Sequence, residues 1–174
     1  QSVKNKGKYE LINIMAGKRA DFIYNLESKL KASLYLRDRI RDTGKKFIMF
    51  SPRNEICDKL SPYRFHSGTS DSDFKKFLNG EIQELAAGKM IREGTNVKNM
   101  ESILLTQVQS KTHTLEQQLG RGLRLTVDFE CKVHIVVAKN TVDQDWARQA
   151  TANLDKTKIT TMDLKRELFD HYTI

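Results

Sequence analysis

The sequence predicts one α/β domain with an open, mostly parallel sheet and helices on both faces. Short apolar runs bounded by Gly, Ser or Pro alternate along the chain with longer segments whose apolar residues recur at helical spacing. Strands that alternate with helices pair in parallel through right-handed crossovers. The 174 residues suffice for one domain with its own core.

The first part of the chain is predicted to lead into this sheet through helices. Residues 1–8 are polar and basic and are expected to form a disordered end or linker. Residues 9–44 carry a helical pattern, which Gly17 is expected to divide into a short and a long helix and Gly44 to end. The expected core residues of this segment are Phe22, Leu26, Leu30, Leu34 and Ile40.

The sheet domain is predicted over residues 45–154, followed by a C-terminal helical tail over 155–174. Its strands are bounded by turn residues, and its helices carry apolar residues on one side. The expected strands are 46–50, 63–66, 82–87, 103–106 and 133–138. The expected helices are 54–60, 71–78, 112–124, 142–154 and 161–169.

Charge and cysteine content narrow the range of partners and locations. The net charge of +8 favours a polyanionic partner, with nucleic acid first and an anionic membrane surface second. The sequence has no apolar run long enough to span a bilayer and no signal-peptide pattern, so no membrane partner is expected. Cys57 and Cys131 match no metal or redox spacing, which favours reduced cysteines in an intracellular protein, cytoplasmic or nucleoid-associated.

The segment QQLGRGLR, residues 117–124, is the most informative part of the sequence. If it is helical, Gln117, Arg121 and Arg124 share one face and present an amide and two guanidinium groups together. Arginine keeps its charge and binds phosphate in a bidentate way, which suits the stabilisation of a transferring phosphoryl group. Taken alone, the same residues also fit an ordinary solvated basic helix.

Further small or phosphate-binding residues follow the predicted strands. In open parallel sheets, ligands bind beyond the carboxyl ends of the strands. Here those positions hold Ser51-Pro52-Arg53, His66-Ser67-Gly68, residues 86–99 and the segment that leads to QQLGRGLR. Each has a backbone that a phosphate can approach or a side chain that can bond to one.

With these segments in this order, residues 19–138 resemble the second, C-terminal motor domain of superfamily 2 helicases and translocases, a RecA-like domain. QQLGRGLR resembles the sixth motif of that family, AAGKMIREGTN the fifth, and FIMFSPRN the strand and loop of the fourth. FHSG and Phe77-Leu78-Asn79-Gly80 look like its His-x-Gly and Phe-x-x-Gly pair, and GKRADFIYNLESK like its lead-in helix. The wording LEQQLGRGLR looks closest to restriction-type and phage-type members.

The resemblance implies a role for each matching residue. Arg121 and Arg124 would act as arginine fingers on ATP, and Gln117 would orient the phosphate or the attacking water. Gly94 and Asn96 would line the nucleotide side of the cleft. The residues expected to contact the backbone of DNA or RNA are Ser51, Arg53, His66, Ser67, Gly68 and Thr95.

Three departures from the family pattern bear on these roles. Gly88 stands where the family usually has a Thr that touches nucleic-acid phosphate, and Asn96 stands where many members have Asp. The helix expected over 71–78 is short and lacks the family's common Arg.

The chain lacks the residues with which the family binds the triphosphate. Its Gly-Lys pairs begin at Gly7, Gly17, Gly44 and Gly88 and are never followed by Ser or Thr, and no Asp is followed by Glu. ATP and Mg²⁺ would therefore be bound mainly by a first RecA-like domain of the same parent chain, and this chain alone is expected to be inactive.

One alternative remains at this stage, a non-catalytic basic α/β module that binds nucleic acid or a protein partner. On that interpretation Arg53 is simply solvated and His66 is a strand-end residue satisfied by the main chain. A phosphoryl transferase of another kind is a more distant alternative, since it would need a phosphate loop of its own.

Overall fold

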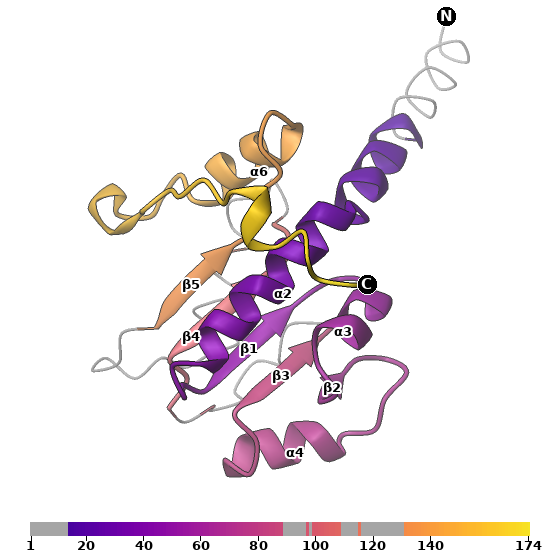
Figure 1. Cartoon of the computed structure of the whole chain (residues 1–174), viewed down its shortest axis with the longest axis vertical. Helices are drawn as coiled ribbons and strands as arrows, with labels where there is room; N and C mark the ends of the chain where they lie inside the picture. The colour runs from indigo at the N-terminus through magenta and orange to yellow at the C-terminus, as the bar shows by residue number, and fades with distance from the viewer. Residues whose placement is uncertain (1–13, 89–96, 98, 109–114, 116–130) are drawn as a thin grey trace, which may run out of the picture.

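A computed structural model describes residues 14–88, 97, 99–108, 115 and 131–174 of the chain. Within them, five parallel strands form one open sheet in the order β2-β3-β1-β4-β5 (Figure 1), which confirms the predicted fold class. The strands are β1 (Phe47–Phe50), β2 (Arg64–Phe65), β3 (Glu84–Ala87), β4 (Ser102–Leu105) and β5 (Lys132–Ile135). Each lies inside or within one residue of its expected range.

Strand β1 is the centre of the sheet and is buried on both sides. It pairs with β3 and β4 in register, so that Phe47 lies opposite both Glu84 and Ser102. All four of its residues are buried, and they alternate between two cores. Ile48 and Phe50 enter one core, and Phe47 and Met49 enter the other.

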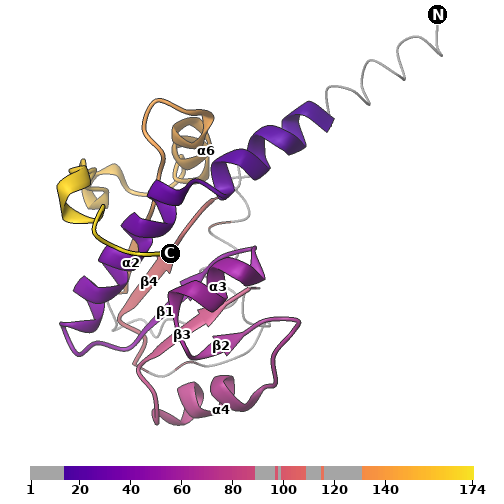
Figure 2. The same ribbon diagram turned by 45° about the vertical axis from the view of Figure 1, so that its right-hand side comes forward.

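Helices cover both faces, as the sequence predicted. The core of Ile48 is closed by Phe77 of α4 (Ser72–Asn79) and by the side chains of α6 (Val142–Ala150), with Trp146 packed at its margin. The core of Met49 is closed by α2 (Glu27–Arg41) and α3 (Asn54–Leu60), and Figures 1 and 2 show α2 lying across that face. No helix of the described part is both long enough and apolar enough to cross a bilayer.

The break in the lead-in helices lies at residues 25–26, and the prediction of a break at Gly17 is wrong. Residues 14–24 are helical through Gly17, and Leu26 then adopts an extended conformation before α2 begins. One glycine costs a helix only about 1 kcal/mol, less than the packing that the turn at Leu26 gives α2. The helical register buries Ile23 instead of Phe22, which is 70% exposed. Gly44 ends the second helix at φ +69°, as predicted.

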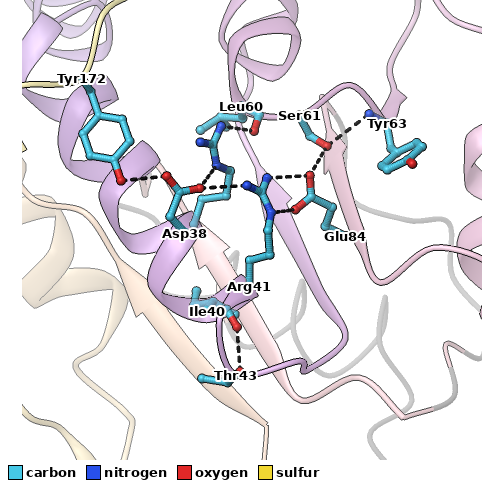
Figure 3. A network of polar contacts seen from close by, with 10 residues as sticks. Asp38, Ile40, Arg41, Thr43, Leu60, Ser61, Tyr63, Glu84 and Tyr172 are labelled. Atoms are coloured by element: carbon cyan, nitrogen blue, oxygen red, sulfur yellow. Dashed lines mark hydrogen bonds and ion pairs between the residues drawn. The ribbon is translucent and has the colours of Figure 1, made fainter.

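The C-terminal tail is not an α-helix over 161–169, which corrects that prediction. It is mostly extended, with 3-10 turns η1 (Lys156–Lys158) and η2 (Arg166–Leu168). Phe169 is buried in the core beside α2, and the Tyr172 hydroxyl donates a 2.7 Å hydrogen bond to Asp38 (Figure 3). These contacts with α2 fix the tail more effectively than a short isolated helix could.

A charged residue at the start of β3 is neutralised by its neighbours. Glu84 is buried and accepts two hydrogen bonds from Arg41, at 2.7 and 2.9 Å, and a third from Ser61 at 2.8 Å (Figure 3). The carboxylate in turn raises the pKa of Arg41. A buried charge is tolerated when it is paired and hydrogen-bonded in this way, so Glu84 can begin a central strand.

A second buried ion pair joins α2 to the start of α6. Lys29 Nζ lies 2.6 Å from Asp143 Oδ2, and the two side chains are 5% and 0% exposed. The same oxygen accepts the Ala138 amide at 2.8 Å, whereas Oδ1 has no partner among the described residues. Burial lowers the pKa of Lys29 from its ordinary value, and Asp143 only partly offsets this.

Removal of one member of this pair should destabilise the domain strongly. Asp143→Ala leaves a buried ammonium without its carboxylate, so we expect a loss of about 3–5 kcal/mol in urea unfolding. Lys29→Met combined with Asp143→Leu should cost less, because no buried charge is left alone. The exposed Lys139–Asp163 pair is the control, and Asp163→Ala should change stability by less than about 1 kcal/mol. Equal effects of the two alanine variants would contradict this.

The contact of the tail with α2 should weaken at alkaline pH. Burial and the hydrogen bond to Asp38 raise the pKa of Tyr172 from 10.0 to about 12. Because the folded-state pKa is the higher one, the contribution is complete below pH 10 and is lost as the pH approaches 12. Tyr172→Phe should cost about 0.5–1 kcal/mol near neutral pH. That deficit should shrink above the unfolded-state pKa, whereas the exposed Tyr63→Phe should show no deficit at either pH.

Candidate nucleic-acid interface

The loops predicted to touch nucleic acid meet at one edge of the sheet. Phe50 of β1 and Phe65 of β2 both lie opposite Ala87 of β3. Because all three strands run in the same direction, the residues after them emerge side by side at the carboxyl edge. The structure therefore brings together two of the predicted segments, Ser51–Arg53 and His66–Gly68, with Gly88 between them.

Gly88 occupies a position with no room for a side chain. A Cβ atom placed there would lie 2.7 Å from the Cβ of His66 and 2.8 Å from Oδ1 of Asn54. Its amide is also fixed, since it donates a 3.0 Å hydrogen bond to the Phe65 carbonyl. The threonine expected from the resemblance could not fit here, which gives the departure at Gly88 a physical reason.

Two polar residues of α3 hold the His66 loop, and the sequence analysis missed both. Asn54 and Asp58 are one helical turn apart and share a face. Asn54 Nδ2 donates to Ser67 Oγ at 2.9 Å, and Asp58 Oδ1 lies 3.0 Å from both His66 Nε2 and an Arg64 nitrogen. The polar i, i+4 pair beside buried Cys57 was the available signal, but its partners are tertiary.

His66 is satisfied within the protein. Its Nδ1 accepts the Gly68 amide at 3.2 Å, so the network assigns the proton to Nε2, which donates to Asp58. The hydrogen bond from His66 is the main reason that the pKa of Asp58 lies below its ordinary value. The imidazole therefore shapes the loop and presents neither ring nitrogen to the solvent.

The first loop divides its two predicted contact residues between different roles. Ser51 is 1% exposed, and its hydroxyl accepts the Arg53 amide at 3.3 Å, so it shapes the turn and offers no surface to a ligand in this conformation. The Arg53 guanidinium is partly exposed and forms an ion pair with Asp21 of the helical segment 14–24. Asp21, which the sequence analysis also missed, occupies one side of the cation that a phosphate would need.

The nucleotide side of the predicted site is not covered by the described residues. Within them, no three His, Cys, Asp or Glu side chains gather as metal ligands would. The roles of the following residues stay predictions, because all six lie outside the described ranges: Gly94, Thr95, Asn96, Gln117, Arg121 and Arg124.

A methyl group at Gly88 should separate the two loops. Gly88→Ala must displace His66 or Asn54, so we expect a loss of about 1–3 kcal/mol in urea unfolding. Gly17→Ala is the matched control, since nothing lies within 4 Å of its added Cβ and the position is helical. That variant should be neutral or up to about 1 kcal/mol more stable. Equal stability of Gly88→Ala and the wild type would refute the crowding at this position.

Comparison with known proteins gives one related sequence and a set of related folds. No family model matches the chain. A stretch of 55 residues, 32% of the chain, is 40% identical to part of "Putative ATP-dependent helicase IRC3" of Saccharomyces cerevisiae. That stretch is 8% of the length of the yeast protein, so the similarity spans a small part of it.

The structural matches are both described as later domains of helicase-type ATPases. One is the C-terminal part of the Fun30 ATPase domain, with a TM-score of 0.50 and 17% identity over 75% of this chain and 47% of that one. Another is domain 2 of the DEAD-box helicase Mss116p bound to an RNA duplex, with a TM-score of 0.53 and 16% identity over 81% and 61%. The chain thus has the open parallel, RecA-like fold of second helicase domains, and covers less than two thirds of either structure.

Proposed function

We propose that this chain is the second motor domain of an ATP-dependent nucleic-acid helicase or translocase. The observation that carries the proposal is the meeting of the loops after β1, β2 and β3 at one edge of a sheet with this fold. The short stretch of identity with a helicase and the net charge of +8 support it. The restriction-type or phage-type subfamily and an intracellular location are further parts of the proposal.

The proposed division of labour follows from the residues present. ATP and Mg²⁺ belong to a first RecA-like domain of the parent chain, where the triphosphate supplies the energy for domain closure. On closure, Arg121 and Arg124 would stabilise charge on the transferring phosphoryl group and Gln117 would orient it or the water. Gly94 and Asn96 would line the nucleotide.

The carboxyl-edge loops would contact the backbone of DNA or RNA. Arg53 supplies a partly exposed cation, and the His66 loop lies beside it across Gly88. Thr95 would join them. Contacts to phosphate carry no base information, so binding should be nearly independent of sequence and should weaken steeply with salt. The Mss116p domain that shares this fold was seen on an RNA duplex, which supports a nucleic-acid partner.

The decisive experiment compares ATP hydrolysis by the full-length parent with and without single- and double-stranded DNA and RNA. Arg121→Ala should reduce nucleic-acid-stimulated turnover by about 10³–10⁵-fold, the usual effect of losing an arginine finger. Arg148→Ala, on an exposed face of α6, should leave turnover unchanged. The 174-residue chain alone should show none.

Two results would refute the proposal. Turnover that ignores every nucleic acid would remove the coupling on which it depends. Turnover that survives Arg121→Ala would remove the finger. Binding of nucleic acid without any effect on turnover would instead favour the basic binding module.

A further inference from the structure

The His66–Gly68 loop uses almost all of its donors internally, and Ser67 is the exception. The His66 amide donates to Thr69 Oγ1 at 2.9 Å, the Gly68 amide to the His66 ring, and the Thr69 amide to the His66 carbonyl at 3.0 Å. Ser67 is exposed. Among the described residues, neither its backbone N–H nor its hydroxyl proton has an acceptor.

Asn54 determines which part of the Ser67 hydroxyl remains available. Because Asn54 Nδ2 donates to Ser67 Oγ at 2.9 Å, one lone pair of the hydroxyl is occupied from the side of α3. The hydroxyl proton must then point away from that bond, toward another acceptor. Asn54 is itself confined, since its Oδ1 lies against the site of Gly88.

The rest of the loop is held as a rigid frame around Ser67. His66 is fixed between Asp58 and the Gly68 amide, and its side chain is only 7% exposed. The Asp58 carboxylate, which would otherwise repel a phosphate, is paired with Arg64 at 3.0 Å. On the other side of Gly88, Arg53 offers a cation from the first loop.

We propose that Ser67 is the residue of this loop that contacts a nucleic-acid phosphate, through its hydroxyl and its backbone N–H, and that Asn54 is the positioning residue that orients the hydroxyl. The inference rests on the proposed function and deepens it. His66, expected from the sequence to make this contact, here belongs to the frame. Two donors from one residue suit a single phosphate oxygen or two neighbouring ones.

The contact can be tested by binding of the 174-residue chain to a fluorescein-labelled oligothymidylate, followed by anisotropy at low salt. Ser67→Ala should weaken binding about tenfold, the usual effect of one hydrogen bond to a charged group. Ser70→Ala, an exposed serine just beyond the loop, is the matched control and should bind as the wild type does. Ser67→Cys, which keeps the shape but donates weakly, should behave like Ser67→Ala.

The positioning role of Asn54 is tested by a double-mutant cycle. In Asn54→Asp a carboxylate replaces the amide donor, so the Ser67 hydroxyl should turn inward and donate to it. The substitution also adds a negative charge, which weakens binding with or without Ser67. The loss caused by Asn54→Asp should therefore be several-fold smaller in the S67A background than in the wild type. A purely structural role would instead lower the melting temperature of both variants.

The outcomes separate this inference from the function on which it rests. A wild-type chain that binds no oligonucleotide at any low salt concentration would overturn the proposed function. A wild-type chain that binds, with S67A binding as tightly as S70A, would overturn the Ser67 contact alone. Equal losses from Asn54→Asp in both backgrounds would overturn the positioning role of Asn54.

Discussion

The complete burial of β1 is the constraint on which the rest of the structure depends. A strand of four apolar residues cannot leave either side in water, so both faces must be covered by helices. Its backbone must also be hydrogen-bonded on both edges, which β3 and β4 provide in register. That register aligns the carboxyl ends of neighbouring strands, and the loops of the candidate interface follow directly from it.

Buried charges fix the elements that surround this strand. Arg41–Glu84 joins α2 to β3, and Lys29–Asp143 joins α2 to α6. Such pairs contribute little net stability, because desolvation opposes their attraction, but a misplaced helix would leave a charge buried alone. We therefore infer that they select the position of α2. The helical segment before α2 is held in turn by Tyr24 against Trp146, and by Asp21 on Arg53.

The sequence was sufficient to predict what depends on local pattern. Apolar runs between turn residues located all five strands, and the positive φ at Gly44 followed from glycine after a helical segment. The helix break was wrong because the turn at Leu26 is set by packing on the sheet and not by Gly17. The tail was wrong because Phe169 and Tyr172 bind α2, a contact that no periodicity records.

The candidate interface divides in the same way. The loops could be named because they follow predicted strands, and the resemblance pointed to Gly88 as an unusual position. Asn54, Asp58 and Asp21 were missed because each acts on a residue brought near only by folding. The burial of Ser51 was missed for the same reason, since one serine in a turn looks like another in a sequence.

The all-parallel sheet also has a consequence for how this domain forms during synthesis. Each strand pair is joined by a crossover, so no two neighbouring strands can close as a local hairpin. On the ribosome, β1 emerges long before Leu105, the last residue of its second neighbour, has been made. Its four apolar residues must wait unpaired through that interval, when loop-closure entropy delays pairing and exposed strands invite aggregation. The segment around Phe47–Phe50 is thus where a nascent chain most needs protection by a chaperone.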